Sequence, residues 1–175
     1  MEVFLADIDE LIKYESVELR NGTDRSEIKK MITDSIAKLE AELVEIQRMI
    51  QVEALYQIDY YNFAVDQLFD KNDKPFLNCN VRHNQNSVSI YWQKARVFNN
   101  PKTGKKQVIF NYIKMRNKDG YSPLDFKSEA PDVQEIACSV EDDFKLLRKG
   151  LRQITEIKKE ISKLSTIVKN ENFGK

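Results

Sequence analysis

The sequence segregates its charge, and the segregated side chains could bind phosphate. Residues 74–118 contain ten lysines and arginines and no aspartate or glutamate, whereas residues 1–73 contain 17 acids and 8 bases and residues 119–175 contain 11 acids and 10 bases. A stretch of this length at the chain's average composition would contain about seven acids. Cations gathered in one segment produce a positive local potential that attracts phosphate, although the whole chain has no net charge.

Different side chains in this segment suit different nucleic-acid contacts. Lysines provide charge for phosphates, the planar guanidinium of arginine can bond guanine through two hydrogen bonds, and aromatic rings stack on bases. We therefore predict a nucleic-acid-binding surface that consists of Arg82, Trp92, Lys94, Arg96, Lys102, Lys105, Lys106, Tyr112, Lys114, Arg116 and Lys118. Two alternatives stay open: the cations protect strand edges or lie against the protein's own acidic helix, or they bind an acidic protein partner.

The residues needed for catalysis do not assemble into a recognisable set. His83 is the only histidine, so neither a metal site with several histidines nor a serine protease-like triad is indicated. The acidic run Glu141 to Asp143 is expected to be a solvated helix face, because successive helical residues point about 100° apart. Tyr60 or Tyr61 as the nucleophile of a DNA-cleaving enzyme is the remaining alternative. We expect a protein that is not an enzyme and that uses no metal or cofactor.

Long helices are predicted on both sides of the basic segment. Apolar residues spaced by four and three predict a helix over 24–70, and the same alternation from Val133 to Ile154 predicts a second helix over 130–169, with its stripe continued after a small shift by Ile157 to Val168. A shorter apolar pattern predicts a helix over 1–20. The seam of the first long helix contains Ile32, Ile36, Leu39, Leu43, Ile46 and Ile50. Neither seam can be buried alone, so we expect the helices to pack antiparallel on each other, on a dimer partner, or both.

Residues 76–118 change to a period of two. β-Branched and aromatic residues alternate with polar ones in three runs, and "NPKTGK" is typical of a hairpin turn in which Gly104 adopts positive φ. The fold class is therefore predicted as α+β. We expect one domain over 1–175, in which an antiparallel helical hairpin or coiled coil carries an inserted three-stranded antiparallel β-meander.

Composition also limits the location of the protein. No apolar stretch approaches the roughly 18 residues needed to span a bilayer, and the acidic N-terminus does not resemble a secretion signal. Cys79 and Cys138 are far apart in the sequence, and we expect both to be reduced and structural. These features favour a cytoplasmic protein that does not bind membranes.

The stretch "SVSIYWQKARVFNNPKTGKKQVIFNYIKMRNKDGYSPLDF", followed by a helix containing "EDDFKLLRKGLRQI", resembles the MobI family of conjugative-transfer proteins. The resemblance covers roughly residues 85–155 and rests on the order of a Trp-bearing strand, a basic hairpin, a Tyr-rich segment and a charged helix. It implies an auxiliary DNA-binding factor that acts at an origin of transfer with a relaxase. The family-like positions are Trp92, Arg96, Tyr112, Lys114, Tyr121, Glu141 and Arg148.

Two functional hypotheses follow from the residues and from this resemblance. In the first, the protein is a DNA-binding accessory factor whose long helices set the spacing of two basic sheets in a dimer formed through the helical seams. In the second, it is a coiled-coil interaction module whose basic sheet docks an acidic protein partner.

Overall fold

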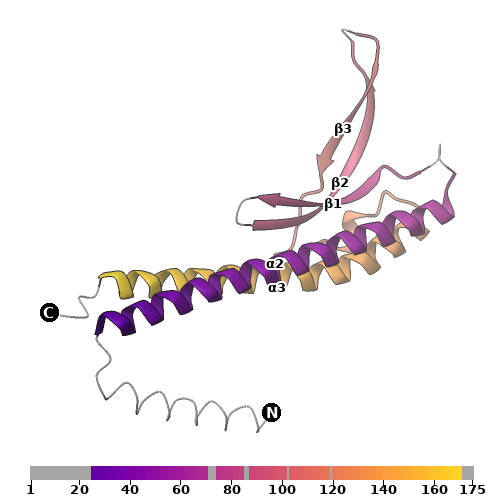
Figure 1. Ribbon diagram of the computed structural model, residues 1–175. Helices are drawn as coiled ribbons and strands as arrows, with labels where there is room; N and C mark the ends of the chain where they lie inside the picture. Colours follow the sequence, from indigo (N-terminus) through magenta and orange to yellow (C-terminus); the bar gives the residue numbers. More distant parts are fainter. Residues whose placement is uncertain (1–24, 71–73, 85–86, 102, 119, 171–175) are drawn as a thin grey trace, which may run out of the picture. The chain divides into compact units, whose positions relative to one another are not determined.

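The structure, a computed structural model, describes residues 25–70, 74–84, 87–101, 103–118 and 120–170 (Figure 1). These residues form two long helices, a three-stranded antiparallel sheet and one short 3-10 helix, so the predicted α+β class is confirmed. The helix predicted over 1–20 lies outside the described residues. No helix in the described part of the chain combines the length and apolar character needed to cross a membrane.

The chain forms two compact units, and both long helices contribute to each of them. One unit contains the described residues up to Glu42 together with those from Lys158 onward, and the other runs from Leu43 to Ile157. In the first unit, Lys29 Nζ on one helix donates a hydrogen bond to the Lys169 carbonyl on the other at 3.5 Å. The second unit contains the sheet and all of the basic segment.

Helix α2 (Arg25–Leu68) buries a stripe that follows the natural pitch of an α-helix. Its buried residues combine separations of seven and of eleven positions, which together stay close to the helical value of about 3.6 residues per turn. They are Ile36, Leu43, Gln47, Ala54, Tyr61 and Val65. The prediction that Leu39 and Ile46 belong to the buried seam is wrong, since their side chains are 52% and 43% exposed. A seven-residue repeat drifts by about 20° per heptad around a straight helix, and this drift carries both residues away from the buried face.

Helix α3 (Pro131–Asn170) keeps a seven-residue repeat instead. The predicted second long helix and its alternation of four and three are confirmed, and the buried positions are Val133, Ala137, Val140, Phe144, Leu151, Ile154, Ile161 and Val168. The expected shift of the stripe does not occur: Ile157 and Leu164 are exposed, and the buried repeat continues unchanged through Ile161.

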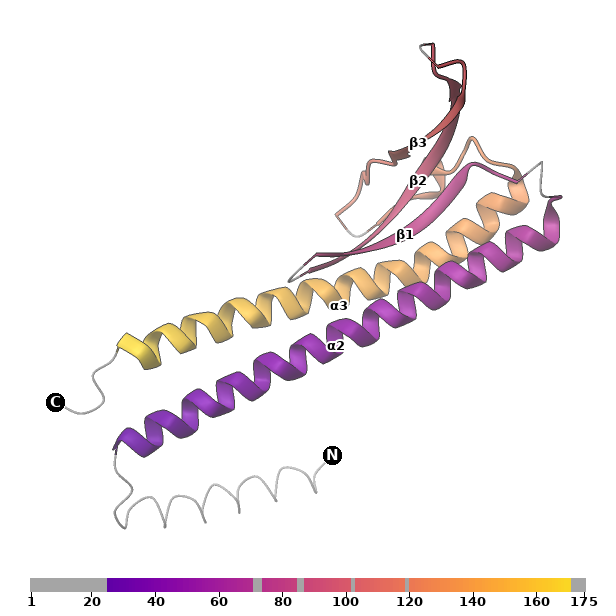
Figure 2. The ribbon, with the colours of Figure 1, turned by 45° about the horizontal axis from the view of Figure 1, so that its top comes forward.

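The three predicted strands are confirmed as an antiparallel meander. Strand β1 (Leu77–Asn84) pairs with the first part of β2 (Ser87–Asn99), and β3 (Lys106–Tyr112) pairs with its second part, in the order β1-β2-β3. Figure 2 shows β2 between its two neighbours. Gly104 adopts φ +64° in the β2–β3 turn, as predicted, and the Asn100 carbonyl accepts a hydrogen bond from its N–H at 2.8 Å.

Only the half of the sheet nearest β1 belongs to the core. Ile90, Trp92, Leu77 and Cys79 are buried in one cluster with residues of α2 and α3, whereas every residue of β3 is exposed. Beyond the core, the ends of β2 and β3 continue as a two-stranded ribbon that extends away from the helices (Figure 1). We refer to residues 94–101 and 103–111 as the ribbon.

Candidate nucleic-acid interface

A buried ion pair on α3 organises the sheet that carries the basic segment. The guanidinium of Arg148 contacts both carboxylate oxygens of Glu141, with Nη1 2.6 Å from Oε1 and Nη2 3.0 Å from Oε2. The same carboxylate accepts the Trp92 indole N–H and the Tyr121 backbone N–H, each at 2.8 Å. Arg148 Nε also donates to the Ile90 carbonyl at 3.0 Å. Strand β2, the segment after β3 and helix α3 therefore meet at one satisfied carboxylate.

Trp92 belongs to this core, which corrects the prediction that its ring stacks on bases. The side chain is 0% exposed, and the rings of Tyr61, Phe126 and Phe144 surround it at centroid distances of 5.1, 5.0 and 5.9 Å. A ring enclosed in this way cannot reach a nucleic-acid base. The predicted solvated face is wrong at Glu141 for the same reason, because that carboxylate is 1% exposed.

Gly120 allows the chain to pass close to the buried carboxylate. A Cβ atom at this position would lie 2.3 Å from Glu141 Oε1 and 2.7 Å from Lys145 Cγ. Both separations are well inside van der Waals contact, so any larger residue would push the Tyr121 N–H away from its acceptor. The geometry of the network therefore requires glycine at position 120.

Tyr61 is not available as a nucleophile. Its side chain is buried, its hydroxyl donates a hydrogen bond to the Leu77 carbonyl at 3.1 Å, and burial raises the pKa of the phenol well above its usual value. The alternative of a DNA-cleaving tyrosine is therefore left with Tyr60 alone. Nearby, burial raises the pKa of the Cys79 thiol to about 12, and both Cys79 and Cys138 are free thiols. Within the described ranges, no cluster of His, Cys, Asp or Glu is arranged to hold a metal ion.

Some of the predicted binding residues are already paired with carboxylates. Lys94 contacts Glu129 at 2.6 Å and also bonds the Ser128 hydroxyl. Arg116 Nε lies 2.8 Å from Asp125 Oδ1, whose side chain is nearly buried. Both cations therefore contribute less to the surface potential than a sequence count suggests.

The remaining described cations of the predicted set are exposed. In the part of the chain that the structure describes, none of them has an acidic side chain within ion-pair distance, and we name them the open cations: Arg82, Arg96, Lys105, Lys106, Lys114 and Lys118. Lys102, which was predicted with them, lies outside the described residues. Cations without a nearby carboxylate keep their full charge for an anionic ligand.

The register shows which of these side chains share a face of the sheet. Lys94 and Arg96 lie on the same face as Trp92, because alternate residues of a strand point the same way. Arg82 is opposite Ser89, which places it on the other face together with Tyr91 and Tyr112. The predicted base-reading arginines therefore do not form a single recognition surface.

One face of the ribbon carries a guanidinium and amides beside the apolar side chains of Phe98 and Ile109. Arg96 is opposite Ile109, and Gln107 and Asn111 lie on the same side of β3. Arginine and amide side chains are the groups that read guanine and adenine in a major groove, which is wide enough to admit a two-stranded ribbon. The other face is mainly apolar, with Val97 opposite Val108 and exposed aromatic residues beside them, and it carries Lys106 opposite Asn99 at the end of the pairing.

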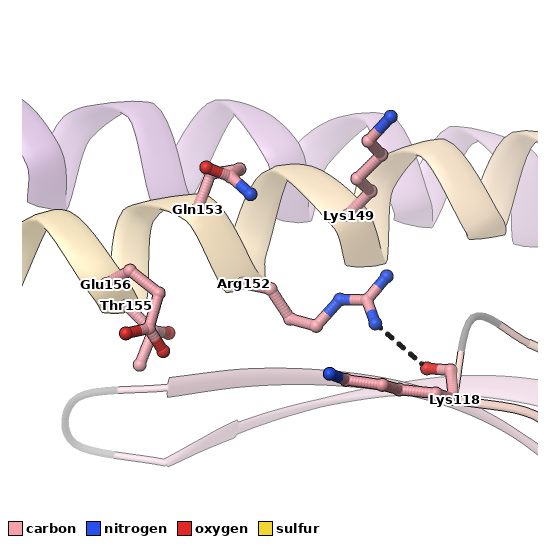
Figure 3. A pocket seen from close by; sticks show the side chains of 6 residues that line it. All are labelled: Lys118, Lys149, Arg152, Gln153, Thr155 and Glu156. Atoms are coloured by element: carbon pink, nitrogen blue, oxygen red, sulfur yellow. Dashed lines mark hydrogen bonds between the residues drawn. The ribbon is translucent and has the colours of Figure 1, made fainter.

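Two cations of α3 were missed in the sequence. Lys149 and Arg152 line an open pocket of about 530 Å³ together with Lys118, and Arg152 Nη1 donates to the Lys118 carbonyl at 3.1 Å (Figure 3). Glu156 lies at the same pocket. Charge counting could not find these residues, because their segment contains almost as many bases as acids. Only the fold brings Arg152 into contact with Lys118, and the Lys149 side chain points away from it (Figure 3).

The model of the MobI protein family matches residues 50–162, which is well over half of the chain. The matched range contains the sheet, the buried carboxylate network and the open cations. The chain therefore belongs to the MobI family, a family of mobilisation proteins. No curated protein and no solved structure matches it.

Proposed function

We propose that this protein is a DNA-binding accessory factor for conjugative DNA transfer, which acts at an origin of transfer together with a relaxase. The observation that carries the proposal is the set of open cations, which are exposed and have no carboxylate partner in the described part of the chain. Family membership supplies the context of mobilisation. The network around Glu141 supports the proposal because it fixes the basic segment on a rigid helix.

Side-chain chemistry indicates which residues would contact phosphates and which would contact bases. Lys105, Lys106 and Lys114 would contact phosphates, and Arg96 with the amides of Gln107 and Asn111 would face base edges. The two long helices would act as an antiparallel helical hairpin that carries the sheet. The protein would work in the cytoplasm without catalytic chemistry of its own, because DNA cleavage would be left to the relaxase.

The test is DNA binding by a variant with reversed charge at the ribbon tip. Lys105→Glu combined with Lys106→Glu should weaken binding to all duplex sequences and reduce the slope of log K against log salt by roughly 2, since each lost phosphate contact removes about 0.9 from that slope. Fluorescence anisotropy over a range of salt measures both quantities. Lys30→Glu with Lys38→Glu, which changes the same charge at exposed positions of α2, is the matched control. Equal losses in both variants, or none in the first, would contradict a role for the tip.

A second function is favoured by the apolar surface of the molecule. Val108 and Phe110 on the ribbon are about half exposed. Met49, Tyr56 and Phe63 on α2 are about two thirds exposed, and exposed apolar residues that lie together are typical of protein interfaces. In this alternative the protein is an interaction module that docks an acidic protein partner. Short-range docking gives a shallow salt dependence, whereas counterion release from DNA gives a steep one, so the same titration distinguishes the two functions.

A further inference from the structure

Strand β3 presents an open edge along which the only charged residue of the strand is Lys106, at its first position. It is the last strand of the sheet, all of its residues are exposed, and in the described part of the chain its backbone pairs with β2 alone. The segment from Gln107 to Tyr112 contains no charge and no proline, and it consists mainly of β-branched and aromatic residues. Proteins usually block an edge of this kind with lysine, proline or a bulge, because it readily pairs with another strand.

The hydrogen bonds of the ribbon define which backbone groups point outward. The Asn100 N–H donates to the Lys105 carbonyl and the Ile113 N–H donates to the Trp92 carbonyl, both at 2.9 Å. Opposed residues in an antiparallel pair alternate between bonded and non-bonded positions, so the odd-numbered residues of β3 bond to β2. The N–H and C=O groups of Val108 and Phe110, together with those of the other even-numbered residues, therefore point to the open edge.

The side chains of β3 are self-complementary about Ile109. An antiparallel copy of the strand centred there would place Val108 opposite Phe110, Gln107 opposite Asn111, and Lys106 opposite Tyr112. These pairs are apolar with apolar, amide with amide and cation with ring, and no like charges are opposed. The same register brings the outward-pointing groups of the even-numbered residues together as bonded pairs, which satisfies both strands at once.

We propose that β3 pairs antiparallel with β3 of a second copy of this chain, in the register centred on Ile109. The two-fold axis passes through the centre of the pair and is perpendicular to the sheet, so the interface is isologous and closed. The three strands of each copy join into one continuous sheet. Because the axis is perpendicular to that sheet, Arg96 of both copies lies on the same face. The pairing does not depend on DNA binding.

The test compares two variants that differ only in the sign of one charge. Val108→Lys with Phe110→Lys places lysine opposite lysine twice in the proposed register, and it should convert the protein to a monomer. Val108→Glu with Phe110→Lys loses the same apolar side chains but places glutamate opposite lysine twice, and it should remain a dimer. Sedimentation velocity of the full chain over a dilution series measures both, and circular dichroism confirms that each variant is folded. Val97→Lys on β2, an exposed position away from the edge, is the control and should stay dimeric.

Disulfide cross-linking tests the register directly, and it leaves Val108 and Phe110 unchanged. Ile109 is the only position that faces itself, so Ile109→Cys should form a disulfide between copies under mild oxidation, whereas Gln107→Cys should not. A monomeric wild-type protein at micromolar concentration would overturn the proposal. Dimers that survive in the double-lysine variant would also overturn it, because they would show that another surface, such as the exposed stripe of α2, joins the copies.

Discussion

At the scale of single residues, the decisive feature is one buried carboxylate that serves three segments of the chain. Glu141 receives the guanidinium of Arg148, the indole of Trp92 and the backbone N–H of Tyr121. Removing one member of such a set leaves a buried charge without its partner, which costs far more than the net contribution of the pair. Four of the family-like positions therefore stabilise the fold instead of contacting a ligand. They are Trp92, Tyr121, Glu141 and Arg148.

This arrangement predicts a specific pattern of stability losses. Glu141→Ala and Arg148→Ala should each lower the free energy of unfolding by about 3–5 kcal/mol, and the double variant should lose clearly less than the sum. Asp142→Ala removes only an exposed pair with Lys145 and should change stability by less than about 1 kcal/mol. Urea unfolding followed by circular dichroism gives all four values. Additive losses at Glu141 and Arg148 would show that the two side chains do not act as a pair.

The sequence reveals the types of these residues but not their roles. Trp92 shares a face with Val88 and Ile90, so alternation alone already favoured burial, yet its neighbourhood of cations suggested stacking on bases. Glu141 follows Val140 at the edge of the buried stripe, and an acid there is usually solvated. Only the approach of distant donors makes burial of this acid favourable, and no local pattern encodes those donors.

At the scale of elements, the spacing of apolar residues predicted the strands and the long helices, because this spacing reflects the local geometry of the backbone. The three strands follow their predicted pattern, and α3 keeps its alternation of four and three without the expected shift. Helix α2 buries only part of the seven-residue seam predicted for it, because Leu39 and Ile46 are exposed. The ribbon is the least expected element, since a two-stranded hairpin with exposed apolar residues on both faces is only marginally stable in water. The exposure of these apolar residues indicates that another protein surface covers the ribbon.

Amide exchange tests the ribbon residue by residue. The N–H groups of Gln107, Ile109 and Asn111 should exchange slowly in every folded form, because they bond to β2. The N–H groups at positions 108 and 110 should be slow in the dimer and fast in the double-lysine monomer. Exchange measured by NMR on both proteins at equal concentration decides this. Slow exchange at positions 108 and 110 in the monomer would mean that something other than a second copy covers the edge.

At the scale of the whole molecule, charge is separated between the acidic residues 1–73 and a basic segment whose carboxylate neighbours are few. Lys94 and Arg116 are paired, whereas the open cations extend from the ribbon to the pocket at Lys118. Counting charges along the sequence found the segment, since no acid interrupts its bases. It could not find the contribution of Lys149 and Arg152 or the division of the arginines between two faces, because both depend on how the strands and helices pack.

Dimerisation and DNA binding together give a prediction that opposes simple electrostatics. The variant with Val108→Lys and Phe110→Lys carries two more positive charges than the wild type, so charge alone would make it bind duplex DNA more tightly. If two copies bind one duplex through a shared sheet, the monomer loses about half of the phosphate contacts, and both its affinity and its salt slope should fall below those of the variant with Val108→Glu and Phe110→Lys. Anisotropy titrations of both variants at several salt concentrations, with stoichiometry measured at saturation, provide the comparison. Tighter binding by the double-lysine monomer would show that each copy binds DNA on its own, and the proposed pairing of β3 would then serve another purpose.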